Sequence, residues 1–324
     1  MKKEELINSL KCQLPKGVEI IKKENSKCSF NVSVAERTPK KISELLYSTF
    51  KPGISKDEWT EKFNMAISGD GQEWRRITTL HSSSLLALLF FSSVNKDNPI
   101  CVADKLFDKV YFEVKNRVFK NSSLQDKPSN IDVMLVSEDK ATLLFLESKF
   151  TEYEHNGKVE VSDKYHIFYS RILKHIPNLK FCNGVLELKE GRNSQYIYGI
   201  KQMFSHLLGL LSEPWHDSID EIKELIRNAK EVELGSIVFN WDGALYKKYQ
   251  EFYNGIFRIF HNNSIILENC LDNEEVDKEK IKRLSLLPDL LSYQDILKEN
   301  PSFKISNEIR KFYTFKNTST HGVS

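Results

Sequence analysis

Residues 129–150 read SNIDVMLVSEDKATLLFLESKF and decide the fold that this sequence predicts. Two runs within this stretch, 131–136 and 142–150, are rich in apolar residues, and the polar residues 137–140 separate them. This pattern is typical of a β-hairpin with a short turn. Both runs are apolar at nearly every position, as strands are when both faces of a sheet are covered. The hairpin is therefore expected in the centre of a sheet.

Three charged residues interrupt this apolar hairpin: Asp132, Glu147 and Lys149. Side chains alternate along a strand, so Glu147 and Lys149 share one face and lie about 6.6 Å apart along it. Antiparallel pairing brings the start of the first strand beside the end of the second. The three residues should therefore meet at one end of the hairpin, next to the loop at residues 128–130.

Two carboxylates that converge in an apolar sheet repel each other, and their desolvation is costly. A hard divalent cation resolves this conflict, because Mg²⁺ binds a few carboxylate oxygens, several waters and a substrate phosphate oxygen. Such an ion lowers the pKa of a bound water and balances charge on a phosphodiester. Lys149 would orient or help deprotonate the attacking water, or stabilise the transition state. The alternative is a structural salt-bridge cluster at the end of a sheet.

Asp132 followed by Glu147-Ser148-Lys149 resembles the D…(D/E)-x-K signature of the PD-(D/E)xK nuclease superfamily. The strings SNIDVMLV and FLESKFTE, HSSSLLALLFF at 81–91 and GIKQMFSHL at 199–207 are similar to a group of bacterial restriction endonucleases in that superfamily. The resemblance spans roughly residues 68–242. Ile131 precedes Asp132 where the name of the superfamily implies proline, which is a common departure.

The resemblance implies an α-β-β-β-α-β core, and the sequence pattern alone gives the same order. We expect an α/β fold with a restriction-endonuclease-like mixed central sheet flanked by helices, and additional helical regions at both ends. Residues 103–109 are an open point, because they could extend as a helix into the first core strand. The expected core elements are helix 83–94, strands 110–119, 131–136 and 142–150, helix 195–211 and strand 232–241.

The chain is expected to have three parts: an N-terminal peripheral region (1–67), the nuclease core (68–244) and a C-terminal helical region packed on the core (245–324). Neither terminal region contains a known nucleic-acid reader motif, so the recognition sequence stays open. Target recognition or oligomer contacts are assigned to these regions. The C-terminal helices are expected at residues 245–260, 274–287 and 293–299.

Four further residues are candidates around the expected metal site. Glu113, on the preceding strand, is proposed as an auxiliary metal ligand, with Glu73 as its competitor and an exposed strand glutamate as the alternative. Glu152 follows the motif, but its strand parity is opposite to that of Glu147 unless a bulge intervenes. Gln202 is expected to hydrogen-bond Lys149, a metal-bound water or the phosphate, although it could equally be a satisfied amide on a polar helix face.

His206 lies one helical turn after Gln202 and is the less favoured candidate of the two. Trp241 is expected to serve core packing. Several basic residues could contact a phosphate backbone, although most such residues are solvated surface. They are Arg75, Arg76, Lys115, Arg117, Lys247 and Lys248.

The 324 residues carry a formal net charge of +2, which neither demands nor excludes a nucleic-acid partner. The five cysteines are scattered without a C-x-x-C pair, which favours a reducing cytoplasm over a disulfide framework. Residues 1–17 lack the apolar run of a signal peptide, and the longest apolar stretch, 85–91, is too short to span a bilayer. We therefore expect a cytoplasmic location and no membrane partner.

These expectations combine into a Mg²⁺-dependent endonuclease that hydrolyses double-stranded DNA, with Mn²⁺ able to substitute and with the resemblance favouring a type II-like restriction endonuclease. Cleavage of both strands would suit a homodimer. A second hypothesis keeps the site but changes the substrate to branched DNA, a flap or RNA. A third is a nuclease-like DNA-binding or interaction protein with a vestigial site, against which the intact Asp132, Glu147 and Lys149 argue.

Overall fold

The structure is a computed structural model, and it describes most of the chain around the predicted hairpin. None of its described helices is long and apolar enough to cross a membrane. The described residues are 2–15, 18–22, 28–30, 38–69, 76–117, 128–151, 179–182, 185–190, 193–196, 200–211, 213–262 and 283–313.

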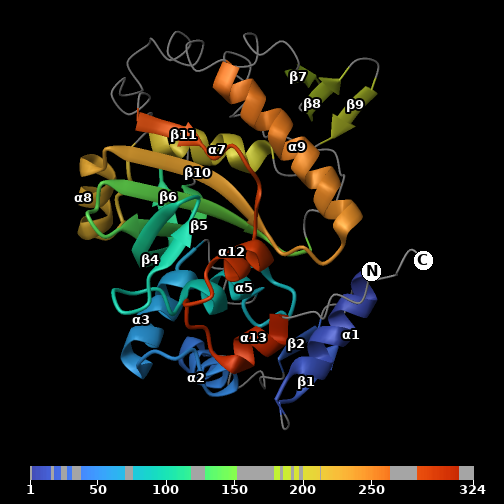
Figure 1. The fold of residues 1–324 in the computed structure, drawn as a ribbon, viewed down its shortest axis with the longest axis vertical. Helices are drawn as coiled ribbons and strands as arrows, with labels where there is room; N and C mark the ends of the chain where they lie inside the picture. The colour runs from blue at the N-terminus through green and yellow to red at the C-terminus, as the bar shows by residue number, and fades with distance from the viewer. Residues whose placement is uncertain are drawn as a thin grey trace.

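A mixed β-sheet forms the centre of the molecule, with strand order β11-β10-β6-β5-β4-β3 and β12 beside β10 (Figure 1). Strands β3 to β6 are successively antiparallel, whereas β10 runs parallel to β6 and is itself parallel to β11 and β12. The prediction of an α/β fold with a mixed sheet flanked by helices is confirmed. The strands are β3 Ile100–Val102, β4 Lys105–Asn116, β5 Ser129–Ser137, β6 Thr142–Lys149, β10 Glu231–Val238, β11 Leu284–Leu286 and β12 Leu291–Ser292.

Helices cover both faces of the sheet at β6. The Ser148 hydroxyl reaches α5 (Ser83–Phe91) and α12 (Tyr293–Glu299), because it lies near Ser83 O and the Tyr293 hydroxyl. Its neighbours Glu147 and Lys149 point the other way, towards α7 (Ile200–Leu211). The alternation of side chains along β6 therefore places Ser148 in the core under α5 and puts Glu147 and Lys149 on the face under α7, at the end of an otherwise apolar row.

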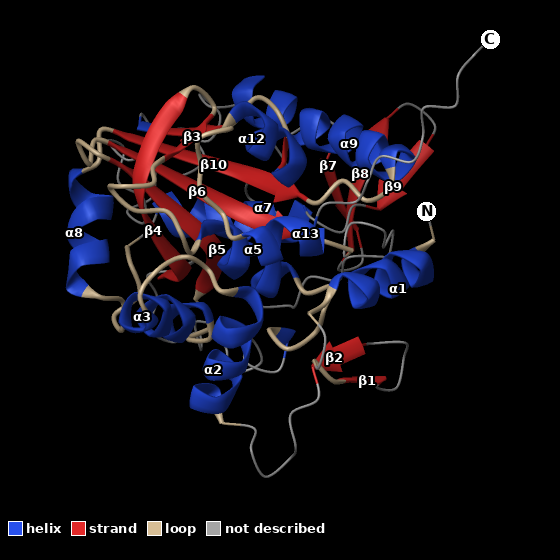
Figure 2. Ribbon diagram, turned by 60° about the horizontal axis from the view of Figure 1, so that its bottom comes forward, coloured by secondary structure: helices blue, strands red, loops and turns tan. Residues whose placement is uncertain are grey.

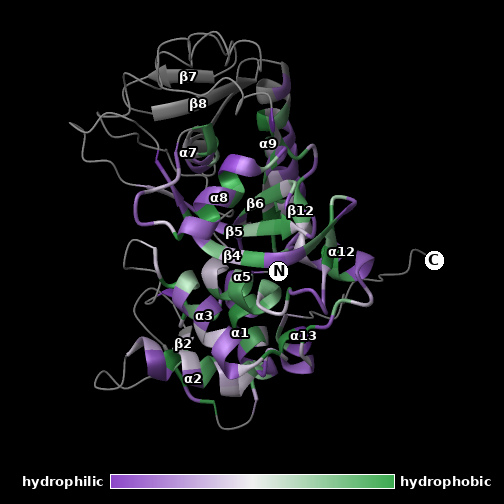
Figure 3. Cartoon of the chain, turned by 90° about the vertical axis from the view of Figure 1, so that its left-hand side faces the viewer, coloured by the Kyte–Doolittle hydropathy of each residue, from purple (hydrophilic) through white to green (hydrophobic). Residues whose placement is uncertain are grey.

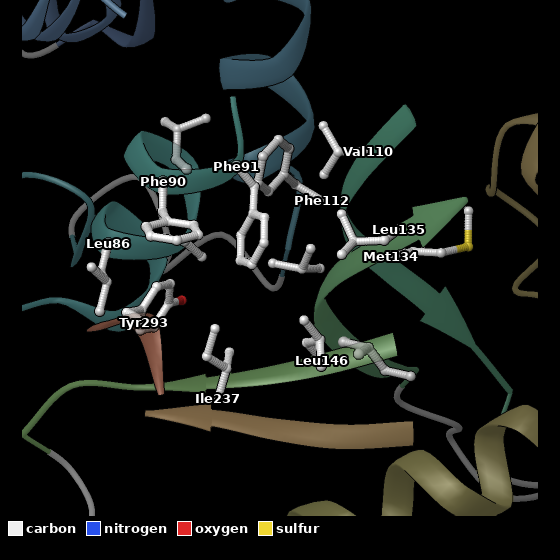
Figure 4. Close-up of a cluster of buried hydrophobic side chains, with 14 of the residues drawn as sticks. Leu86, Phe90, Phe91, Val110, Phe112, Met134, Leu135, Leu146, Ile237 and Tyr293 are labelled. Atoms are coloured by element: carbon white, nitrogen blue, oxygen red, sulfur yellow. The ribbon is translucent and has the colours of Figure 1, made fainter. Parts of the chain in front are cut away.

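The core face is packed with large apolar side chains from the sheet and from α5. Helix α5 begins where the Ser82 hydroxyl accepts a hydrogen bond from Leu85 N, and every residue from Leu85 to Phe91 is buried. Figure 4 shows side chains of α5 and Tyr293 facing those of the sheet, and Figure 3 shows hydrophobic colour along α5. The labelled residues in this cluster include Leu86, Phe90, Phe91, Leu135, Leu146 and Ile237.

The N-terminal region packs beyond α5, on the side away from β10 (Figure 2). Helix α2 begins after Thr38, whose hydroxyl accepts a hydrogen bond from Lys41 N. At its end, the Phe50 ring lies 5.1 Å from that of Phe312 in the C-terminal helix α13 and 6.0 Å from that of Phe30. The two ends of the chain thus share one core. These elements are α1 Lys3–Gln13, β1 Ile20–Lys22, β2 Cys28–Phe30, α2 Pro39–Phe50, α3 Lys56–Ala66 and α13 Asn307–Tyr313.

The predicted helix 195–211 is wrong at its beginning. Residues 195 and 196 belong to β9 (Asn193–Tyr196), where they pair with β8 (Val185–Glu190), and α7 begins only at Ile200. Together with β7 (Leu179–Cys182), these strands form a separate antiparallel sheet, which lies between β6 and α7 in the sequence. Backbone pairing with β8 holds residues 195 and 196 in an extended conformation, which the pattern of the segment 195–211 does not reveal.

One further expectation is wrong, and the open point at residues 103–109 is decided. Residues 284–286 are the strand β11, not part of a helix 274–287, because they complete the hydrogen bonds of β10 in parallel register; residues 274–282 lie outside the described part. Residues 103–109 do not form a helix. Ala103 and Asp104 have positive φ values of 49° and 61° and turn the chain between β3 and β4.

The other core elements occur where they are predicted, with shifted ends. Helix α5 ends at Phe91 rather than at 94, and β10 ends at Val238 rather than at 241. Strand β4 begins earlier than predicted, at Lys105, and ends at Asn116. Trp241 is buried and its Nε1 donates to Phe150 O at 3.0 Å, which agrees with a packing role. Helices α8 (Asp220–Asn228) and α9 (Gly243–Asn262) flank β10 in the sequence.

We expect Tyr293→Phe to lower the free energy of unfolding by about 1 kcal/mol, because it removes a buried hydrogen bond. The Tyr293 hydroxyl lies 2.7 Å from Ser148 Oγ and ties the C-terminal region to β6. Urea unfolding would measure the change. Tyr47→Phe is the matched control, since the Tyr47 hydroxyl donates to Ile54 O in a half-buried place and its loss should cost less. Equal stabilities of the Tyr293 variant and the wild type would contradict this expectation.

Candidate functional site

The predicted acidic residues lie at one end of the β5–β6 hairpin. Backbone pairing runs to Val133 and Leu146, and one further step in this register places Asp132 opposite Glu147. The Asp132 carboxylate accepts a hydrogen bond from the backbone N–H of Ser148 at 2.7 Å. A side-chain oxygen of β5 therefore binds the backbone of β6 just beyond the last paired residues, Val133 and Leu146.

Glu147 and Lys149 form a buried ion pair on the face of β6 that α7 covers. Their exposed fractions are only 3% and 4%, and the Lys149 ammonium donates to Glu147 Oε1. The same ammonium donates to Gln202 Oε1 at 2.7 Å, from the first turn of α7. The predicted contact between Gln202 and Lys149 is thus present in the structure.

His206 contacts the other oxygen of Glu147. Its Nε2 atom lies 2.7 Å from Glu147 Oε2, and its Nδ1 atom lies 2.6 Å from Ser129 Oγ at the start of β5. His206 is 3% exposed and Ser129 is 5% exposed. Both carboxylate oxygens of Glu147 therefore have a partner: Lys149 contacts Oε1 and His206 contacts Oε2.

The electrostatic surroundings keep Glu147 ionised. Burial by itself raises the pKa of its carboxyl, but the electrostatic effects of Lys149 and His206 and the hydrogen bonds from both side chains outweigh burial. The net effect lowers the pKa below its ordinary value. The site therefore presents a carboxylate, rather than a neutral acid, at neutral pH.

A glycine allows α7 to approach the strands closely at this point. A Cβ atom built at Gly209 would lie 3.0 Å from the Cβ of Asn116 and 3.1 Å from the Cβ of Ser129. Distances of this kind are tighter than ordinary van der Waals contact, so a larger residue would push the helix away from β4 and β5. Gly209 thus helps to keep His206 within reach of both Ser129 and Glu147.

Glu113 occupies a different position from the other candidates. The pairs Phe112–Val133 and Val114–Ile131 place it opposite Asp132 in register, but its φ is 49°, a conformation that is uncommon outside glycine. Glu113 is buried and lines a cavity of about 370 Å³ together with residues of α3 and residues 217–219. Asp132, Glu147 and Lys149 do not line that cavity. Glu73 and Glu152 lie outside the described residues.

The residue types at the hairpin end fit a hard divalent cation, because Asp132 and Glu147 offer carboxylate oxygens on neighbouring strands. A cation at Glu147 would have to share or replace the contacts with Lys149 and His206. Within the described ranges, no group of three or more His, Cys, Asp or Glu side chains is arranged to hold a metal ion. The two carboxylates therefore supply at most part of a coordination shell, and water and substrate would have to supply the rest.

The predicted phosphate-contacting residues are spread over the molecule. Lys115 donates to Ser68 O, and Arg117 N donates to Glu213 O at the end of β4. Lys247 and Lys248 are exposed on α9, and Arg76 is exposed before α5. Arg75 lies outside the described residues. The arrangement does not single out one of these residues as a DNA contact.

Sequence reasoning missed the contact of Ser129 with His206 and placed His206 below Gln202 as a candidate. Ser129 was part of the quoted motif string, but a serine at the start of a strand has no distinguishing pattern. The four-residue spacing of Gln202 and His206 was the available signal, because it puts both side chains on one face of α7. No protein-family model, curated protein or solved structure matches this chain.

Proposed function

We propose that this chain is a Mg²⁺-dependent endonuclease that hydrolyses DNA phosphodiester bonds. The observation that carries the proposal is the buried pair of Glu147 and Lys149, which lies at one end of the central hairpin with Asp132 opposite. Burying charged groups in such a place costs free energy, which their mutual attraction offsets only when the geometry is excellent. A catalytic role would explain why the sequence keeps them there. The order α5-β4-β5-β6-α7-β10 agrees with the core that the resemblance to PD-(D/E)xK nucleases implies.

In this proposal Asp132 and Glu147 hold the cation. Glu113 lines a separate cavity with residues of α3, so it is not assigned to the coordination shell. When bound, Mg²⁺ would acidify a water and balance negative charge on the scissile phosphate. Lys149 orients the attacking water or stabilises the charge that develops in the transition state. Gln202 holds the Lys149 ammonium at 2.7 Å and so limits the positions that the ammonium can take.

One observation favours a second candidate, a nuclease-like DNA-binding protein without catalysis. Lys149 and His206 already satisfy both oxygens of Glu147. A buried network that is complete without a cation is also what a purely structural cluster would show. The two candidates differ in whether the site binds Mn²⁺ or Mg²⁺, which an experiment can decide.

The test is cleavage of supercoiled plasmid DNA with Mg²⁺, with Mn²⁺ and with EDTA, for the wild type and Asp132→Ala. Linear duplex, branched DNA and RNA in parallel reactions identify the substrate class, and size-exclusion chromatography with light scattering tests the proposed homodimer. Cation-dependent nicking or linearisation by the wild type alone would support the nuclease. Equal cleavage by the wild type and Asp132→Ala would reject the site. A protein that binds DNA but neither cleaves it nor binds Mn²⁺ would support the non-catalytic candidate.

A further inference from the structure

A continuous chain of hydrogen bonds runs from β5 through α7 to β6. It connects Ser129 Oγ to His206 Nδ1 at 2.6 Å and His206 Nε2 to Glu147 Oε2 at 2.7 Å. All three side chains are at least nine-tenths buried. We propose that His206, oriented by Ser129, is a positioning residue that fixes the carboxylate of Glu147 for cation binding. This inference rests on the proposed function.

A single neutral tautomer of His206 satisfies every contact in this chain. The Ser129 hydroxyl donates to Nδ1, and the N–H at Nε2 donates to Glu147 Oε2, which can only accept when the carboxylate is ionised. The Glu147 carboxylate can only accept, so it requires the proton on Nε2, while the Ser129 hydroxyl holds the ring from the Nδ1 side. The positioning therefore requires no charge on the histidine.

The two carboxylate oxygens of Glu147 have different partners. Lys149 holds Oε1 from the same strand, whereas His206 holds Oε2 from the opposing helix. The contact at Oε2 does not depend on Lys149, so it persists when the contact at Oε1 is exchanged. A cation that takes the place of Lys149 at Oε1 would thus meet a carboxylate already oriented by His206.

The packing of α7 supports this arrangement. Gly209 lies three residues after His206, and its missing side chain lets α7 approach Ser129. Glycine in a helix interior costs about 1 kcal/mol relative to alanine, so its presence there is unfavourable unless the close approach requires it. Gly209→Ala should therefore favour helix formation and yet weaken the contact between His206 and its partners.

The experiment compares His206→Leu, His206→Gln, Ser129→Ala and Gly209→Ala with the wild type. Glutamine can offer an N–H near the place of Nε2, whereas leucine fills similar volume without a donor. Mn²⁺ affinity is measured by calorimetry without nucleic acid, kcat and KM by plasmid cleavage, and Tm by thermal unfolding. Leu210→Ala on the same helix is the control for packing, because Leu210 is buried and its aliphatic side chain cannot hydrogen-bond Ser129, His206 or Glu147.

Loss of a residue that orients a metal ligand weakens metal affinity by about 10- to 100-fold. We expect this loss for His206→Leu, a smaller loss for Ser129→Ala and Gly209→Ala, and an affinity within about threefold of wild type for His206→Gln. Leu210→Ala should lower Tm without changing Mn²⁺ affinity. Equal losses of Mn²⁺ affinity in His206→Leu and His206→Gln, or an unchanged Mn²⁺ affinity in His206→Leu, would overturn this inference and leave the proposed function standing. A wild type that neither binds Mn²⁺ nor cleaves any nucleic acid would overturn the proposed function as well.

Discussion

Lys149→Ala is expected to lower the rate of plasmid cleavage by about 100- to 1,000-fold, the loss that follows removal of one donor aimed at developing charge. The Lys149 ammonium is buried beside Glu147 and is held by Gln202, so water cannot readily replace it in the same position. The loss should appear in kcat, with little change in KM, because the ammonium acts most strongly in the transition state. Quenched-flow or gel-based cleavage at saturating Mg²⁺ would measure it.

Gln202→Ala provides the graded comparison for this prediction. Gln202 touches Lys149 but lies on the exposed side of the first turn of α7, so its loss should reduce cleavage by only about 10-fold. DNA affinity in Ca²⁺ should stay close to wild type in both variants, since the Lys149 ammonium is buried and the Gln202 amide oxygen is engaged by it. A Lys149→Ala protein that cleaves at the wild-type rate would remove the lysine from the mechanism.

The hairpin could be predicted because its information is local. The apolar runs of β5 and β6 flank a polar turn, and the alternation of side chains assigns Glu147 and Lys149 to one face without knowledge of the rest of the fold. The antiparallel register then follows from the short turn, which places Asp132 opposite Glu147. Helix α5 could be predicted equally well from the sequence, since a serine cap precedes a run of apolar residues that begins with strong helix formers.

The features that sequence reasoning missed depend on distant partners. Leu284–Leu286 form a strand only because the edge of β10 is available for pairing, and Tyr196 extends β9 because β8 lies beside it. The contact between Ser129 and His206 joins residues that are 77 positions apart in the sequence. The positive φ of Glu113 likewise has no local signal, because glutamate carries no preference for that conformation. Such features arise from packing and not from local propensity.

Glu147→Leu is expected to lower the free energy of unfolding by about 3–5 kcal/mol, because it leaves the buried ammonium of Lys149 without its carboxylate. Gln202 would remain as an acceptor for Lys149, but a neutral amide compensates a buried charge incompletely. Lys149→Met should cost less, since the carboxylate of Glu147 keeps its hydrogen bond with His206. Urea unfolding of both variants, with Cm and m determined together, would measure these costs.

The double variant Glu147→Leu/Lys149→Met separates stability from catalysis. Replacing both charges by apolar groups of similar size removes the buried ion pair, and such replacements are often neutral or stabilising. The double variant should therefore be more stable than Glu147→Leu alone, while cleavage stays absent. Strictly additive costs of the two substitutions would mean that the pair does not interact energetically. A double variant that is at least as stable as the wild type but does not cleave would show that the fold does not need the two charges, even though His206 Nε2 loses its acceptor in that variant.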